Sequence, residues 1–261
     1  MTPFRPRILF QGCPLCQSDA ARFIRQGNSS AHPLYNPLVD PVMNWMECGN
    51  CSHVFTDGYY ASEVYAALFN TVLDKRKPGA DFESQRYVSA RMVEKVARYT
   101  SLGRWLDVGF GNGSLLFTAQ EWGFDPVGID LRPGHVEELK RLGVEAHCVD
   151  LADLREPDGF AVISMADVLE HMPFPRKALG DAYRLLRPHG VLFTSMPHFN
   201  CAAWKLLDAN NANPYWNEIE HLHNFSRQRL CQLAEEAGFS FLHYGVSERY
   251  RVCMEVIFRR D

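Results

Sequence analysis

The stretch Trp105-Leu106-Asp107-Val108-Gly109-Phe110-Gly111-Asn112-Gly113-Ser114 decides the fold of this 261-residue chain. It begins as a short apolar strand that contains a carboxylate, and it ends in three alternating glycines. A helical pattern follows at once, from Leu115 to Trp122. Glycines let backbone amides and a helix N-terminus come close to a bound molecule. The stretch therefore predicts a nucleotide-like ligand at a strand-to-helix turn.

The positions of the glycines distinguish two cofactors. A dinucleotide fingerprint needs Gly-x-Gly-x-x-Gly/Ala, whereas the third small residue is Ser114 here and the third glycine comes one residue early. Asp107 stands two residues before Gly109, where it would repel a pyrophosphate and attract an ammonium group. S-adenosylmethionine carries such a group. These residues resemble motif I of the class I S-adenosylmethionine-dependent methyltransferases.

Further strand patterns follow in the order that this resemblance implies. The second strand ends at Asp130, whose carboxylate can accept hydrogen bonds from both hydroxyls of a ribose. In the family, the acidic residue after the third strand approaches the adenine amino group, and the loop after the fourth strand lies beside the transferring methyl group. A helix cap is the alternative role for such aspartates. The candidate cofactor-binding residues are Asp107, Gly109, Gly111, Gly113, Asp130, Asp150, Leu151 and Asp167.

The whole set of patterns predicts an α/β fold. We expect a Rossmann-like, seven-stranded, mostly parallel sheet with helices on both faces, preceded by a small N-terminal zinc-ribbon-like module. Two residues depart from the family pattern, because Ala161 replaces a common Asp and His189 replaces a usual Gly. The predicted domains are a zinc-binding module at 1–58, a helical linker or cap at 59–100, and a methyltransferase domain at 101–261 with a substrate insertion at 198–225.

The eight cysteines fall into two groups. Four of them form two Cys-x-x-Cys pairs, and the other four are isolated in the sequence. In a reducing compartment, two such pairs favour structural Zn²⁺ with four thiolate ligands over disulfides. A redox-active thiol pair and ordinary structural cysteines are the alternatives. His53 could replace one ligand, although a core histidine is the commoner role. The predicted zinc ligands are Cys13, Cys16, Cys48 and Cys51.

The segment 198–225 is rich in Asn, Trp and His, and it follows the fifth strand, at the edge where open α/β sheets bind ligands. Methyl transfer from a sulfonium is an in-line displacement, so the enzyme aligns the acceptor and, for an alcohol, removes its proton. The pKa of histidine suits this task. We predict His221 as the first candidate base, with His171 and His223 as further catalytic candidates and His198 in the same group of loops. Hydrogen bonding to the backbone is the alternative role of His221.

Composition and charge limit the partners. The chain is 46% hydrophobic and 22% charged, as in globular proteins, and no apolar run approaches the roughly 20 residues of a membrane span. The first residues do not resemble a signal peptide, so we expect a cytoplasmic protein. A net charge of −4, with only a short basic run at residues 75–77, counts against a nucleic-acid partner without excluding one. No oligomeric state is predicted.

Three functions remain open at this point. The leading one is a methyltransferase that acts on an oxygen, or a nitrogen, of a small polar metabolite such as a sugar or glycan precursor. The second is a zinc-containing ribosomal RNA base methyltransferase, which such a four-cysteine module also resembles; the N-terminal arginines that favour it are Arg5, Arg7, Arg22 and Arg25, against Asp19. The third is an inactive, zinc-bearing interaction protein that has kept the cofactor pocket.

Overall fold

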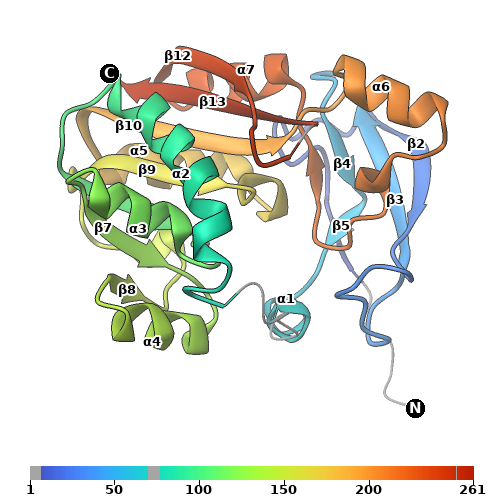
Figure 1. Cartoon of the computed structure of the whole chain (residues 1–261). Coiled ribbons are helices and arrows are strands. Elements are labelled where there is room, and N and C mark those ends of the chain that lie inside the picture. Colours follow the sequence, from blue (N-terminus) through green and yellow to red (C-terminus); the bar gives the residue numbers. More distant parts are fainter. Residues whose placement is uncertain (1–6, 70–76, 251) are drawn as a thin grey trace. The chain divides into compact units, whose positions relative to one another are not determined.

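The structure is a computed structural model, and it describes residues 7–69, 77–250 and 252–261. Arg5 and the first two residues of the basic run at 75–77 lie outside the described residues. The chain forms two compact units (Figure 1). Unit 1 comprises Met1–Thr71, Glu170–Arg176 and Pro197–Leu233, and unit 2 comprises Val72–Leu169, Lys177–Met196 and Ala234–Asp261. The predicted domain boundaries at 58 and 100 stay a prediction.

Unit 2 is built on a seven-stranded sheet in the order β12-β13-β10-β9-β6-β7-β8. Neighbouring strands from β10 to β8 pair in parallel, and β12 pairs with β13 in antiparallel fashion. This is the Rossmann-like, mostly parallel sheet that the sequence predicts. The strands are β6 (Arg104–Val108), β7 (Asp125–Ile129), β8 (Glu145–His147), β9 (Phe160–Ala166), β10 (Leu186–Pro197), β12 (Phe239–Val246) and β13 (Cys253–Arg260).

Helices cover both faces of this sheet, with α2 and α3 in front of the strands and α5 behind them in Figure 1. The apolar residues of α2 recur at helical spacing, and Met92, Val93 and Val96 pack with Trp105 of β6 in one buried cluster. The central strands are buried along almost their whole length, as parallel strands under helices must be. The helices of unit 2 are α2 (Phe82–Ala97), α3 (Ser114–Glu121), α4 (Pro133–Arg141) and α5 (Pro175–Leu185). Helix α7 (Arg227–Glu236) is divided between the units, with its residues up to Leu233 in unit 1.

His189 adopts the left-handed conformation, with φ of 62°, that explains the usual glycine at its position. The pairing of β10 with β9 shifts register between Leu186 and Val191, so the residue sits in an irregularity at the start of the strand. Histidine is one of the non-glycine residues that tolerate this conformation best. The departure from the family pattern therefore leaves the fifth strand of the domain intact.

Unit 1 contains a four-stranded antiparallel sheet in the order β11-β4-β3-β2 and a two-stranded pair of β1 and β5. Its edge strand β11 comes from the segment predicted as the substrate insertion, so residues 198–225 fold together with the N-terminal residues. The elements are β1 (Ile8–Leu9), β2 (Ala21–Asn28), β3 (Val42–Cys48), β4 (Val54–Thr56), β5 (Gly58–Tyr59), α1 (Ser62–Phe69), α6 (Ala202–Ala209) and β11 (His223–Asn224).

The insertion is more regular than its sequence indicates. Helix α6 lies within it, and Trp204 of this helix and Trp216 are buried, with ring centroids 5.3 Å apart. Trp45 of β3 contacts Trp216 edge to face, and its indole N–H donates to the carbonyl of Trp216 at 2.9 Å. The tryptophans of the insertion therefore form a core of unit 1. None of the helices in the described part of the chain is long and apolar enough to cross a membrane.

Candidate cofactor and metal sites

The three glycines after β6 give the loop its shape. Gly109, Gly111 and Gly113 all adopt positive φ angles, of 65°, 55° and 74°. A side chain at Gly109 would meet a methyl group of Val168 at 3.0 Å, whereas at Gly111 nothing lies within 4 Å. The backbone at Gly111 therefore faces open space, at a φ that only glycine adopts without strain. This is the geometry that a ligand needs in order to reach main-chain amides.

Asp107 is buried at the end of β6 and belongs to a hydrogen-bond chain. The hydroxyl of Ser164 donates to its Oδ1 at 2.6 Å, and the indole N–H of Trp105 donates to the Ser164 hydroxyl at 2.9 Å. Burial raises the pKa of Asp107 to about 7, against the opposing effects of the Ser164 hydrogen bond and the charge of Arg249. A cationic group would stabilise the charged carboxylate, so the site favours an ammonium ligand.

Asp130 stands beside this loop because β6 and β7 are parallel neighbours, with Asp107 opposite Gly128. Its carboxylate is buried, and Arg132 contacts both of its oxygens: the guanidinium donates to Oδ1 at 2.7 Å and to Oδ2 at 2.5 Å, and the main-chain amide donates to Oδ1 at 2.9 Å. A carboxylate offers about four lone-pair sites, so these three contacts leave one for a hydroxyl group, and a second hydroxyl would have to replace a contact with Arg132. The two carboxylates and the open glycine backbone suit a cofactor with an ammonium group and a ribose, and S-adenosylmethionine has both.

The remaining cofactor candidates differ in their surroundings. Asp150 is exposed, and its carboxylate accepts from the Ala152 amide at 2.8 Å, which is the capping role named as its alternative. Leu151 is buried. Asp167 has a positive φ of 57° and an ion pair with Arg249 at 3.3 Å. Roles at the adenine and beside the methyl group stay predictions for these three residues.

Two residues that the sequence does not predict lie beside the acidic side chains: Ser164 at Asp107 and Arg249 at Asp167. Ser164 is one residue of an apolar strand, and only the register of β9 against β6 places it opposite Asp107. Arg249 lies more than 80 residues beyond Asp167 in the sequence. No local motif marks either residue. Aligning the strand of Ser164 with the strand of Asp107 would have placed these two residues opposite each other.

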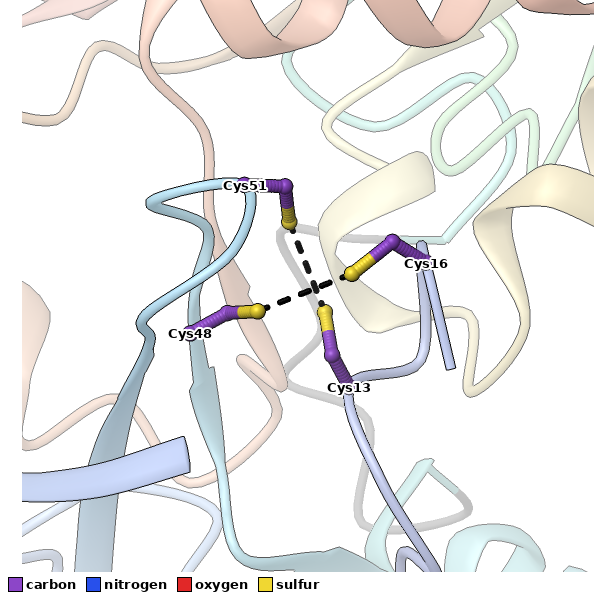
Figure 2. Close-up of side chains that lie close together, drawn as sticks. All are labelled: Cys13, Cys16, Cys48 and Cys51. Atoms are coloured by element: carbon purple, nitrogen blue, oxygen red, sulfur yellow. Dashed lines mark hydrogen bonds between the residues drawn. The ribbon is translucent and has the colours of Figure 1, made fainter. Parts of the chain in front are cut away.

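The four cysteines of the two Cys-x-x-Cys pairs converge in unit 1 (Figure 2). Sγ of Cys13 lies 3.6 Å from Sγ of Cys51, and Sγ of Cys16 lies 3.6 Å from Sγ of Cys48. A disulfide would need about 2.05 Å. Four thiolates about 2.3 Å from a tetrahedral Zn²⁺ would stand roughly 3.8 Å apart. The observed spacing fits this metal, and the cysteines are positioned to bind it.

The two pairs have matching backbones. Gln17 and Ser52, which directly follow the second cysteine of each pair, both adopt a left-handed conformation. Amides return to the first cysteine in both turns, from Gln17 to the Cys13 carbonyl at 2.8 Å and from Ser52 to the Cys48 carbonyl at 2.9 Å. Asn50 also donates to the Cys16 sulfur at 3.5 Å, the kind of contact that orients metal ligands. The first turn lies between β1 and β2, and the second between β3 and β4.

Three of the candidate histidines lie close together in unit 1, in two different settings. Both ring nitrogens of His223 have partners, His53 at 3.0 Å and the Met172 carbonyl at 3.0 Å. Burial lowers the pKa of His53 well below its usual value and that of His223 to about 3. This pair holds buried loops together, so His53 has a core role. The rings of His171 and His221 instead contact each other edge to face, with centroids 4.8 Å apart.

The fold and the glycine loop define a Rossmann-like protein with a strand-to-helix loop of the S-adenosylmethionine-binding type. The family model of the methyltransferase domain matches residues 60–244. The chain therefore belongs to the methyltransferase-domain family. The cysteines at 13, 16, 48 and 51 lie before the matched range.

Curated relatives resemble part of the chain. A ubiquinone biosynthesis O-methyltransferase of Coxiella burnetii is 27% identical over 149 residues, which are 52% of this chain and 63% of that protein. The match thus covers less than two thirds of the relative's length.

Solved structures share the fold at low identity. The 1,6-didemethyltoxoflavin-N1-methyltransferase of Burkholderia thailandensis, solved with bound 1,6-didemethyltoxoflavin and S-adenosylhomocysteine, aligns with a TM-score of 0.58 at 17% identity, over 81% of this chain and 97% of that one. The [4+2]-cyclase SpnF aligns with a TM-score of 0.52 at 18% identity, over 66% and 80% of the two chains. Because a cyclase shares the fold, the fold alone does not specify the reaction.

Proposed function

We propose that this protein transfers a methyl group from S-adenosylmethionine to an oxygen, or a nitrogen, of a small polar metabolite. The observation that carries the proposal is the pairing of the buried Asp107 with the open backbone at Gly111, next to Asp130 on the neighbouring strand. Asp107 would hold the ammonium group, the loop amides would approach the amino-acid end of the cofactor, and Asp130 would accept from the ribose. Family membership supports this assignment.

The bound cofactor would supply an electrophilic methyl group on a sulfonium. The chain then has to align an acceptor atom with that methyl group and, for a hydroxyl acceptor, to take up its proton. His221 and His171 remain the candidate proton acceptors. Burial lowers the pKa of His221 well below its usual value, so its imidazole is neutral but a weaker base than an exposed histidine. If His223 accepted the proton instead, it would lose one of its two buried hydrogen bonds, because both of its ring nitrogens already have partners.

The comparisons favour a small molecule over RNA as the acceptor. The Coxiella relative is named as an O-methyltransferase, and the Burkholderia neighbour as an N-methyltransferase. Two of the arginines that would favour RNA have acidic partners within unit 1, since Arg22 pairs with Glu47 and Arg25 pairs with Asp208. The proposed zinc ligands are the four clustered cysteines, with a structural role. We further expect the protein to act in the cytoplasm.

Calorimetry with S-adenosylhomocysteine tests the cofactor site. Wild-type protein should bind it, and Asp130→Ala should weaken binding by about tenfold or more, since charge-assisted hydrogen bonds to the ribose are lost. Asp125→Ala is the matched control, because Asp125 is an exposed residue at the opposite end of the same strand. Absence of binding to the wild type would refute the proposal and favour an inactive interaction protein.

Incorporation of a radiolabelled methyl group distinguishes the two acceptor classes. The protein would be incubated with labelled S-adenosylmethionine and either a small-molecule extract or total RNA. We expect label in hydroxyl- or amine-bearing small molecules. Label confined to RNA, together with RNA affinity that falls steeply with salt, would support the ribosomal RNA alternative instead.

A further inference from the structure

Arg249 lies among the acidic side chains near the carboxyl ends of the parallel strands of unit 2. It belongs to the turn between β12 and β13, and its Nη1–H donates to Oδ2 of Asp167 at 3.3 Å. Its positive charge also acts on Asp107, where it opposes the effect of burial on the pKa of that carboxyl. All three residues belong to unit 2. One cation of this unit therefore faces two acidic groups on the neighbouring strands β6 and β9.

The guanidinium of Arg249 has more donors than its contact with Asp167 uses. An arginine side chain carries five N–H donors, and the hydrogen bond to Asp167 takes one of them. The buried Nε makes no hydrogen bond to any residue that the structure describes. The whole side chain is 22% exposed, so a molecule at the strand ends can reach it. The donors that remain suit an anionic oxygen group, which a guanidinium can bind through two parallel hydrogen bonds.

The strand order places Arg249 on one particular side of the proposed cofactor. Asp130, after β7, is the proposed ribose ligand, and Asp107 of β6 is the proposed ammonium ligand. In the order β10-β9-β6-β7, the strand on the other side of β6 is β9, which Asp167 follows directly. The pair of Arg249 and Asp167 therefore lies across Asp107 from the ribose position. The nucleoside part of the cofactor extends away from this side, which leaves the side to the methyl acceptor.

We propose that Arg249 binds an anionic oxygen group of the methyl acceptor, so that the substrate is a small acid with a carboxylate or phosphate group. Both groups offer the oxygen geometry that a guanidinium matches best. Arg249 would hold and orient the acceptor without taking up its proton, since arginine stays protonated in proteins. The inference rests on the proposed function, because it requires the cofactor to occupy Asp107 and Asp130.

The balance of charges predicts the order of binding. When Asp107 and Asp167 are both ionised and no cofactor is bound, an incoming anion meets two negative charges and one positive charge. The ammonium group of the cofactor would neutralise Asp107 and remove this repulsion. An anion should therefore bind more tightly to the cofactor-loaded protein. If Arg249 instead held the carboxylate of the cofactor itself, loading should weaken anion binding, so the two roles predict opposite signs of coupling.

Calorimetric titration with inorganic phosphate and, separately, with acetate tests this inference. Each anion is titrated at pH 8, where Asp107 is mostly charged, into the protein with and without saturating S-adenosylhomocysteine. At least one anion should bind the loaded protein about fivefold or more tightly than the unliganded protein. The anion that gains more affinity identifies the group on the acceptor: phosphate indicates a phosphate ester, and acetate indicates a carboxylic acid.

Two substitutions assign the anion to Arg249. Arg249→Gln should weaken anion binding to the loaded protein by about tenfold or more, because a charge-assisted pair is lost. Arg249→Lys keeps the positive charge without the fork of donors, so it should retain part of the affinity. Arg141→Gln is the matched control, because Arg141 is an exposed arginine of α4 that also has a carboxylate partner, Glu138. This control should bind both anions as the wild type does.

The wild type alone can overturn the inference, so a misfolded variant would not hide a negative result. If neither anion binds the loaded protein, or if S-adenosylhomocysteine weakens anion binding, Arg249 does not hold the acceptor. Equal anion affinity in the wild type and Arg249→Gln would overturn the inference as well. In these cases the protein still binds S-adenosylhomocysteine, and the proposed function stands. A wild type that does not bind S-adenosylhomocysteine would instead refute the proposed function and this inference together.

Discussion

The affinity of the cofactor site should depend on pH through Asp107. Burial raises the pKa of this carboxyl from an ordinary value of 3.8 to about 7 in the unliganded protein. The proposed ammonium ligand needs the charged form, so binding below pH 7 must release a proton. Each pH unit below the pKa then costs about tenfold in affinity, or about 1.4 kcal/mol. Between pH 7.5 and pH 6, the dissociation constant of S-adenosylhomocysteine should rise by roughly tenfold.

Calorimetry in two buffers with different ionisation enthalpies measures this effect. At pH 6 close to one proton should be released for each ligand bound, and at pH 7.5 much less. Asp107→Asn is the control variant, because it keeps the size of the side chain and cannot titrate. Its affinity should be lower and its pH dependence should lose the Asp107 component. An identical pH slope in the wild type and in this variant would refute the role of Asp107.

The same pKa makes a prediction about stability. The carboxyl is neutral in the folded state up to about pH 7, whereas it ionises near pH 3.8 when unfolded. The free energy of unfolding of the unliganded protein should therefore fall as pH rises between these two values, by at most on the order of 4 kcal/mol from this group. Asp107→Asn should lose this decline, which denaturant unfolding at pH 4 and pH 8 would detect.

Three further predictions concern neighbouring features. Ser164→Ala removes the hydrogen bond that favours the charged carboxylate, so the calorimetric pH profile should move to higher pH; an unmoved profile would contradict the Ser164–Asp107 contact. Gly111→Ala should weaken S-adenosylhomocysteine binding by about tenfold or more, because of left-handed strain and the blocked approach. Gly134→Ala, also with open space around it, should not. Cys16→Ser should lower zinc content and melting temperature, whereas exposed Cys148→Ser should change neither; equal zinc in both would exclude the four-cysteine site.

Most of unit 2 could be predicted because its signals are local. The apolar strand before Gly109, the glycine register and the acidic strand end at Asp130 each lie within a few residues. The order of such segments gives the parallel sheet and the carboxylate positions, since successive parallel strands end at one edge. Even the departure from the family's usual glycine at His189 depends only on the φ angle of that residue.

Unit 1 was harder to predict because it is assembled from distant parts of the chain. Residues 198–225 have no clear periodicity, yet β11 pairs with β4 and Trp216 packs against Trp45. These contacts join residues about 170 positions apart, which no sequence window contains. The aromatic residues of the insertion indicate a substrate surface when only the sequence is considered, whereas Trp204 and Trp216 are buried in a core.

The sequence by itself determined the cofactor class and the four-cysteine site, because both depend on residue types at short, fixed spacings. Only the tertiary structure decided how the histidines are grouped. It paired His223 with His53 in a buried hydrogen bond and brought His171 and His221 together beside Glu170. The physical reason is that side-chain proximity across 50 or more residues depends on loop packing, which leaves no periodic trace in the sequence.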